Sequence, residues 1–205
     1  MRLLLFSDLH CDLQAAERLV ARSRDFDALV GAGDFGASRR GVGVCFEVLR
    51  TIERPAVIVP GNNESLDELT EAAAVWPSAR VLHGAGCAVD GVAFFGLGGG
   101  VPTTPFGAWS WDFSEDAARE LLAAMPSGAV LVTHSPPWGT LDHGPGARPR
   151  GSVAVREAVD AKSPPLVVCG HIHACGGQWD AIGSSWVVNA GPDGVAWNLE
   201  RGEPS

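Results

Sequence analysis

Leu3-Leu4-Leu5-Phe6-Ser7-Asp8-Leu9-His10 opens the chain as a short apolar run that ends in an aspartate and a histidine. The same arrangement occurs four more times, each an apolar run followed at once by polar groups. Short apolar runs bounded by glycine are typical of buried strands, and in open α/β sheets ligands collect beyond the carboxyl ends of such strands. The five runs end in Asp8-Leu9-His10, Gly33-Asp34, Gly61-Asn62-Asn63-Glu64, His134 and Gly170-His171-Ile172-His173.

These strand ends supply carboxylate, amide and imidazole donors. Such donors suit borderline divalent metals such as manganese, iron or zinc. Asp8 and His10 have one residue between them, as have His171 and His173, and on an extended segment both members of such a pair face the same side. The sequence therefore predicts a metal site assembled from five strand ends.

A single buried histidine or aspartate beside a strand is more often a hydrogen-bonded structural group than a metal ligand. The joint pattern reverses that expectation, because four of the six histidines fall in matching positions. The other two are His83, before a glycine, and His143, within a loop. We expect turn or surface roles for both, with contact to substrate as the alternative.

The composition is that of a globular protein. With 205 residues, 46% apolar and 19% charged, the chain fits one domain over residues 1–205. The net charge of -9 and the presence of one lysine, Lys162, argue against a nucleic-acid partner, because neutralising the phosphates needs clustered Lys and Arg. A small phosphate ester remains possible as the substrate, because bound divalent cations would make the local electrostatic potential positive.

The five cysteines are scattered and form no Cys-x-x-Cys pair, which indicates reduced thiols. Residues 1–6 begin a strand and do not have the pattern of a signal peptide. No apolar run is long enough to span a bilayer. We therefore expect a cytoplasmic protein without membrane attachment. The sequence leaves the oligomeric state open.

Strand-like runs alternate with helical periodicity in the first half, and short strands joined by turns follow from Arg80. Asp90-Gly91 is a strong hairpin signal, and Ser65 with Glu68 has the spacing of a capping box. The pattern predicts an α/β fold with mixed sheets. The expected helices are Asp12–Arg24, Val44–Glu53, Ser65–Val75, one from Ser114 to before Pro126, and Ser152–Ala161.

Two long segments, Gly98–Trp111 and Pro136–Gly151, are rich in glycine, proline and aromatic residues. Loops of that length inside a domain are usually functional or disordered, so we expect both to form the rim of a substrate cleft. Trp109 and Trp138 are the expected substrate-binding residues. Packing against the scaffold is an equal alternative for these tryptophans and for Trp111.

The order Asp-x-His, Gly-Asp, Gly-Asn-x-Glu, His and Gly-His-x-His resembles the calcineurin-like metallophosphoesterase superfamily, from about Met1 to Asn198. Within it, Gly96–Thr103 and Thr133–Gly139 are similar to the Icc-related phosphoesterase branch. The resemblance implies a four-layer αββα sandwich, in which two mixed β-sheets are flanked by helices.

The resemblance also implies two divalent metal ions. Manganese is expected first, with iron, zinc or nickel as alternatives. Asp34 would bridge the ions, and a hydroxide between them would attack the phosphate ester. One ion would be held by Asp8, His10, Asp34 and His173, and the other by Asp34, Asn62, His134 and His171.

Asn63 is a departure from the family pattern. Many members carry a histidine there that can act as general acid, whereas an amide donates hydrogen bonds but does not transfer a proton. We place Asn63 and Asp34 at the catalytic position, with Asn63 also in contact with substrate. The substitution predicts an enzyme that favours good leaving groups, or one with a substitute acid.

The function expected from this resemblance is phosphodiester hydrolysis of a small phosphoester, nucleotide-like or aryl because of the loop tryptophans. A phosphomonoesterase on the same metals is one alternative, and a non-catalytic metal-binding scaffold of the same fold is another. A nuclease is a third alternative, weakened by the acidic charge.

Overall fold

The first of two six-stranded sheets contains strands from both ends of the chain. Its strands are β1 (Arg2–Phe6), β2 (Ala28–Ala32), β3 (Ala56–Val59), β4 (Ala79–Val81), β11 (Val195–Asn198) and β12 (Glu203–Pro204), in the order β12-β11-β1-β2-β3-β4. The strands β1 to β4 are parallel, β11 is antiparallel to β1, and β12 is antiparallel to β11. The computed structural model describes residues 1–144 and 148–204.

The second sheet is built from the middle of the chain. Its strands are β5 (Ala85–Val89), β6 (Val92–Leu97), β7 (Val130–Thr133), β8 (Leu166–Cys169), β9 (Gln178–Ile182) and β10 (Ser185–Asn189), in the order β5-β6-β7-β8-β10-β9. The four inner strands are parallel and the two edge strands antiparallel. The hairpin between β5 and β6 turns at Asp90-Gly91, as predicted, with both residues at positive φ.

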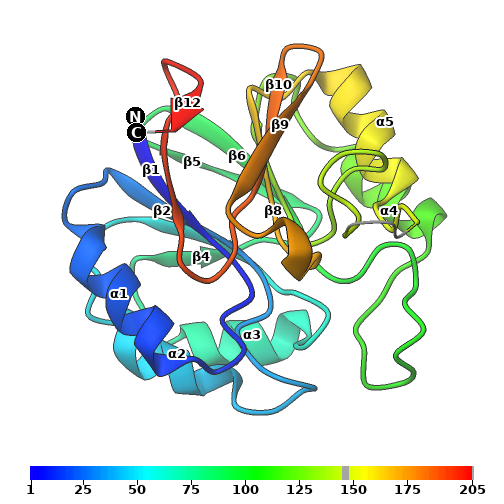
Figure 1. Ribbon diagram of the computed structural model, residues 1–205. Helices are drawn as coiled ribbons and strands as arrows, with labels where there is room; N and C mark the ends of the chain where they lie inside the picture. Colours follow the sequence, from blue (N-terminus) through cyan, green and yellow to red (C-terminus); the bar gives the residue numbers. More distant parts are fainter. Residues whose placement is uncertain (145–147, 205) are drawn as a thin grey trace.

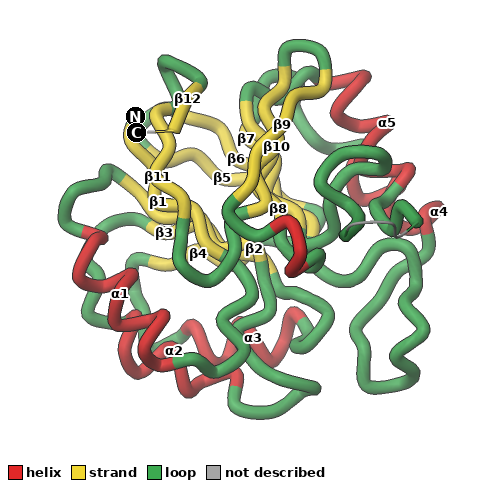
Figure 2. Tube along the Cα trace, viewed as in Figure 1, coloured by secondary structure: helices red, strands yellow, loops and turns green. Residues whose placement is uncertain are grey.

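Helices cover the outer face of each sheet (Figures 1 and 2). On the first sheet lie α1 (Leu13–Ser23), α2 (Val42–Leu49) and α3 (Leu66–Ala73); on the second lie α4 (Glu115–Leu122) and α5 (Val153–Lys162). A short 3-10 turn, η1 (His173–Cys175), follows β8. Four helices begin at a side-chain cap, on Asp12, Ser65, Ser114 and Ser152. The predicted αββα sandwich is confirmed.

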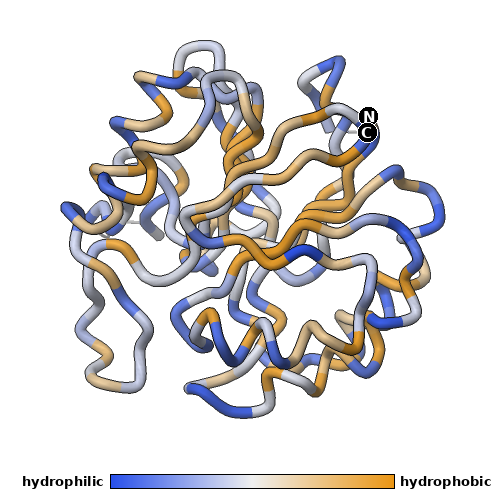
Figure 3. Tube along the Cα trace, turned by 180° about the vertical axis from the view of Figure 1, so that it is seen from behind, coloured by the Kyte–Doolittle hydropathy of each residue, from blue (hydrophilic) through white to orange (hydrophobic). Residues whose placement is uncertain are grey.

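The apolar residues of the inner strands are divided between a core that lies between the two sheets and a core under the helices of their own sheet. On β1, Leu3 and Leu5 pack between the sheets, whereas Leu4 and Phe6 pack under the helices of the first sheet. A strand buried on both faces reads as a continuous apolar run. In Figure 3 the strands accordingly form an apolar band between more polar outer segments.

The turn after β1 differs from the extended segment expected for Asp8 and His10. Asp8 has φ 56° and His10 φ 44°, and His171 has φ 66° while His173 begins the turn η1. The prediction that each pair faces one side because its segment is extended is therefore wrong. The N–H groups of Asp8 and His10 donate to the carbonyls of Gly33 and Asp34 at 2.9 and 3.0 Å, so pairing with the next loop fixes this turn.

All five cysteines are free thiols, as predicted. Among the described residues, no helix combines the length and the apolar character needed to cross a bilayer.

Replacing Ser65 by alanine should lower the free energy of unfolding. The Ser65 hydroxyl accepts from the Glu68 N–H at 3.3 Å, and the Glu68 carboxylate accepts from the Ser65 N–H at 2.8 Å. Loss of an N-cap costs about 1 kcal/mol. Urea unfolding measures this, with Ser65→Thr as the matched control that keeps the hydroxyl. Equal midpoints for the alanine and threonine variants would contradict the role of the cap.

Candidate metal centre

Asp8, His10, Asp34 and His173 form a compact group of donors. One donor atom from each lies within 4.8 Å of the others. His10 Nε2 is 3.1 Å from His173 Nε2 and 3.6 Å from Asp34 Oδ2, and His173 Nε2 is 3.6 Å from Asp8 Oδ1. These are the four residues that the resemblance implied for the first ion.

The orientation of His10 tests whether this group fits a metal ion. Its Nδ1 lies 3.1 Å from the carbonyl oxygen of Gly36. A carbonyl oxygen only accepts, so Nδ1 carries the proton and Nε2 of the neutral ring presents a lone pair. That lone pair faces the carboxylate of Asp34 and the ring of His173. Lone pairs that converge on one another need a cation or a proton between them, so the donor set fits a divalent metal.

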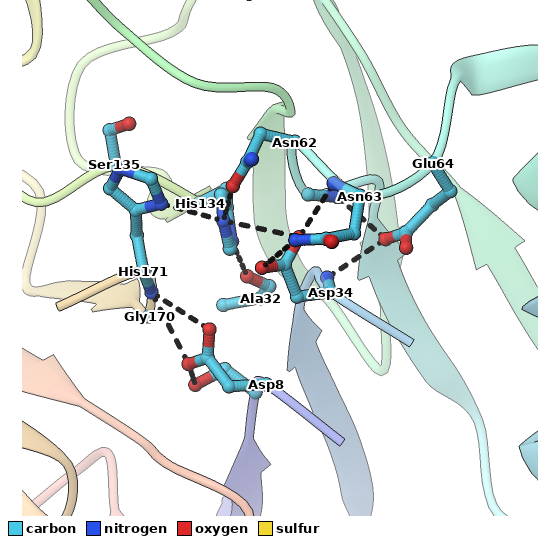
Figure 4. Close-up of polar contacts among 12 residues, drawn as sticks. Asp8, Ala32, Asp34, Asn62, Asn63, Glu64, His134, Ser135, Gly170 and His171 are labelled. Carbon is cyan, nitrogen blue, oxygen red and sulfur yellow. Dashed lines mark hydrogen bonds and ion pairs between the residues drawn. The ribbon is translucent and has the colours of Figure 1, made fainter. Parts of the chain in front are cut away.

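A second group adjoins the first and shares Asp34 with it. His134 Nε2 lies 3.1 Å from Asn62 Oδ1, 3.4 Å from Asp34 Oδ1 and 3.2 Å from His171 Nδ1. Figure 4 shows Asp34 between His134 and Asn63. Oδ1 of Asp34 faces this second group while Oδ2 faces His10. The structure thus brings all seven predicted ligands together, and their division between two ions remains a prediction.

Hydrogen bonds behind the second group fix its donors. His134 Nδ1 donates to the Ala32 carbonyl at 2.8 Å, which leaves Nε2 as an acceptor. The Ser110 hydroxyl donates to the carboxylate of Asp112 at 2.7 Å and accepts from Asn62 Nδ2 at 2.9 Å. The amide of Asn62 is therefore oriented with its oxygen toward His134.

The ionisable groups of this buried site shift one another's pKa values. The pKa of Asp34 stays below its ordinary value, because the lowering by His134 and His10 exceeds the raising by burial. Burial lowers the pKa of His134, but Asp34 and Asp8 raise it further, to about 9. Burial and the charge of His134 lower the pKa of His171 to about 4. Positive charge is therefore favoured between Asp34 and His134, where a metal ion would replace a proton.

Glu64 joins the loops that follow β2 and β3. It is fully buried, and its Oε1 accepts from the N–H groups of Asp34, Gly61 and Phe35 at 2.8, 2.7 and 3.3 Å. Its Oε2 accepts from the Gly36 N–H at 3.1 Å. Burial and the charge of Asp34 raise the pKa of Glu64 to about 7. The motif contained Glu64, but its role in joining the loops depends on contacts that the sequence does not show.

Gly61 is required where the two loops touch. A Cβ atom at this position would overlap both Oδ1 and the backbone nitrogen of Asp34. The close approach brings the backbone of the loop after β3 against the carboxylate that both groups share.

Asn63 holds Asp34 in place. Its Nδ2 donates to Asp34 Oδ2 at 2.7 Å, its backbone N–H donates to Asp34 Oδ1 at 2.9 Å, and its Oδ1 accepts from the Ser38 N–H at 2.7 Å. Both ends of the amide are thus engaged inside the protein. This geometry gives Asn63 a positioning role toward Asp34, although the residue also borders the cleft described next.

A cleft of about 970 Å³ opens over the candidate ligands. Its lining includes residues 102–106 and Trp109 from the first predicted loop, and His143, Gly144, Pro149 and Arg150 from the second. Both predicted loops therefore contribute to it, although residues 145–147 of the second loop lie outside the described residues. The ring of Trp109 stacks on Phe106, with centroids 5.7 Å apart and planes 13° apart. Sequence reasoning missed Phe106 and Arg150, whose only signal was their place in these loops.

Two tryptophans and His83 have other surroundings. Trp138 is 45% exposed and is not among the described residues that line the cleft, so the structure does not bring it to the expected substrate position. Trp111 packs against His83 and Phe113, with ring centroids 4.9 and 4.7 Å away. His83 Nδ1 accepts from the Gly98 N–H at 3.2 Å. Trp111 and His83 thus support the loop from inside.

Asp34→Asn should remove both ions, because Asp34 alone faces both groups of donors. His10→Asn should mainly weaken the first site and His134→Asn the second. Metal analysis of the purified variants after dialysis against manganese measures this. Two ions retained by Asp34→Asn would contradict the bridging role.

Glu64→Gln should destabilise the protein without removing a metal ligand. A glutamine has one acceptor oxygen, so its NH₂ group would face a backbone N–H, and an unsatisfied buried donor costs about 1–3 kcal/mol. Thermal unfolding of the metal-free and metal-loaded variant measures the loss. An unchanged melting temperature in both states would show that Glu64 does not join the loops.

Comparisons with known proteins agree with the fold. Residues 1–202 match the model of the calcineurin-like phosphoesterase superfamily domain. A search of curated proteins found no match. The fold is similar to that of TT1561 from Thermus thermophilus, with TM-score 0.81 and 22% identity over 100% of this chain and 96% of that one. It is also similar to a novel archaeal phosphodiesterase, with TM-score 0.61 and 14% identity over 100% and 98% of the two chains. A dimetal phosphatase from Danio rerio has TM-score 0.57 and 14% identity over 92% and 86%. The chain belongs to the calcineurin-like phosphoesterase superfamily and is a hydrolase of phosphoester bonds.

Proposed function

We propose that this hydrolase is a phosphodiesterase with two divalent metal ions, manganese first among them. The observation that carries the proposal is the cleft, which is lined by donors from both groups. Among the described residues that line it, Arg150 is the one lysine or arginine. A phosphodiester carries one negative charge, and a phosphomonoester carries up to two. A cleft with metal ions at its floor and a single basic side chain suits the less charged ester.

Room for a second ester group supports the same proposal. The wall at residues 102–106 and Trp109 is largely apolar, and Phe106 is 48% exposed. Stacked aromatic rings beside a phosphate site suit a flat substituent, such as a nucleobase or an aryl group. We therefore propose a small nucleotide-like or aryl phosphodiester as the substrate.

Two bound divalent ions would activate a water molecule and neutralise phosphoryl oxygens during an in-line displacement. The residues of this chain prepare the site for that chemistry. Asn63 and Gly61 hold Asp34 between the two groups of donors. Arg150 lines the cleft and would supply a cation for the phosphate, and its backbone N–H donates to the Asp142 carbonyl at 3.0 Å.

Phosphomonoester hydrolysis on the same metals and a metal-binding scaffold without activity are the alternatives. The five free thiols suit a reducing compartment, so the proposal places the enzyme in the cytoplasm.

Bis(p-nitrophenyl) phosphate and p-nitrophenyl phosphate separate the three functions in one assay. The proposal expects kcat/KM with manganese to be at least tenfold higher for the diester, and chelation followed by manganese should remove and restore activity. A preference for the monoester would make the protein a phosphomonoesterase. Metal binding without turnover of either ester would make it a scaffold.

Trp109→Ala should reduce kcat/KM for a nucleotide-type diester about tenfold, because stacking of a base on an aromatic ring contributes about 1–3 kcal/mol. A dialkyl phosphate should be affected little. Trp179→Ala is the matched control, because Trp179 is 46% exposed and lies on β9, outside the lining of the cleft among the described residues. An equal loss for both kinds of diester, together with a lowered melting temperature, would indicate that Trp109 only packs.

A further inference from the structure

Because Asn63 stands where many family members carry the general acid, another residue would have to protonate the leaving group. Its amide is engaged with Asp34 and Ser38, so it neither carries a transferable proton nor is free to turn toward a leaving group. His83 is engaged with Gly98 and is packed between aromatic rings. Among the described residues that line the cleft, one histidine outside the two groups of donors remains, His143.

His143 is held by a buried carboxylate. Its Nδ1 lies 2.9 Å from Oδ1 of Asp142, whose side chain is fully buried while that of His143 is 47% exposed. A carboxylate accepts, so Nδ1–H donates to it, and Nε2 is the ring atom at which a proton is exchanged. None of the hydrogen bonds among the described residues involves Nε2.

Asp142 is itself fixed in place. Its Oδ2 accepts from the N–H groups of Gly139 and Gly151 at 2.8 and 3.2 Å. Two backbone groups thus hold the carboxylate that orients His143. The carbonyl of His143 accepts from the Cys175 thiol at 3.3 Å, which ties the histidine to the turn that carries His173.

The placement of His143 in the cleft fits a proton donor. His143 lines the same cleft as Arg150, Trp109 and the candidate ligands His10, Asp34, Asn62, His171 and His173. A phosphodiester bound at these ligands would thus have both the aromatic pair Phe106 and Trp109 and the imidazole of His143 within the same cleft to receive its two substituents. A histidine oriented by a carboxylate is a common form of general acid and base.

We propose that His143 is the general acid of this enzyme and that Asp142 positions it; the proposal rests on the phosphodiesterase function proposed above. Water supplies the oxygen of the new P–O bond and releases a proton to solvent. The P–O bond to the leaving group breaks with its electron pair on the leaving oxygen, which takes the proton from Nε2 of His143. An alcohol leaves, and the neutral imidazole takes a proton from solvent.

Leaving-group dependence tests the proposal. For the native enzyme, kcat/KM across aryl and alkyl diesters should depend weakly on the acidity of the leaving group. In His143→Gln, kcat should fall about 100-fold for alkyl leaving groups, a typical contribution of general-acid catalysis. It should change little for p-nitrophenyl, which leaves readily without a proton.

Asp142→Asn keeps the shape of the side chain but presents an amide to His143. In this variant kcat should also depend more steeply on the acidity of the leaving group than in the native enzyme, but less steeply than in His143→Gln, and KM should be unchanged. Metal content and melting temperature are compared for all variants, and the p-nitrophenyl diester is the internal control for folded, metal-loaded enzyme.

Three results would overturn the assignment. Parallel leaving-group plots for native and His143→Gln enzyme would show that His143 transfers no proton. A rise in KM by the same factor for every ester would make it a phosphate-binding residue instead. Absence of turnover of any ester by the native protein, with metals bound, would refute the proposed phosphodiesterase function itself, which distinguishes that failure from the other two.

Discussion

The convergence of buried carboxylates and imidazoles on a small volume is the constraint on which this structure depends. Asp8, Asp34 and His134 are buried, and bringing such groups together without counter-charge is costly. The sandwich accommodates them because its two sheets face each other and the ends of their parallel strands meet along one edge. Asp34 is at the centre, bonded by Asn63 and faced by histidines from both sheets.

Backbone conformation contributes to the same arrangement. Asp8, His10, Asp34 and His171 all have φ between 44° and 66°, a region that costs non-glycine residues of the order of 1 kcal/mol each. The hydrogen bonds of the Asp8 and His10 N–H groups to the neighbouring loop hold two of these residues there. Local strain of this kind is common where donors must point at one place.

Much of the fold could be predicted because its signals are local. Apolar runs marked the strands, and Ser65, Ser114 and Ser152 marked helix starts through caps within four residues. The candidate ligands could be predicted because each follows such a run. The layer architecture came only with the family resemblance, and the order of strands in the sheets was not predicted, because it depends on contacts between distant segments.

The parts of the site that escaped prediction depend on such distant contacts. The left-handed turn at Asp8 is set by pairing with residues 33 and 34. The engaged amide of Asn63 requires Ser38. Trp138 was predicted to lie at the cleft because its long loop flanks the ligand-bearing segments, whereas the structure bonds its backbone groups to Ser152 and Arg156 and leaves it out of the cleft lining.

The position of β1 has a consequence for biosynthesis. This strand lies between β2, which follows it closely in the chain, and β11, which is synthesised much later. Asp8 likewise meets His171 across 163 positions of sequence. During translation, β1 therefore waits with one edge unpaired until β11 has left the ribosome, and unpaired edges promote aggregation. The strand order thus leaves the completion of the first sheet to the end of synthesis.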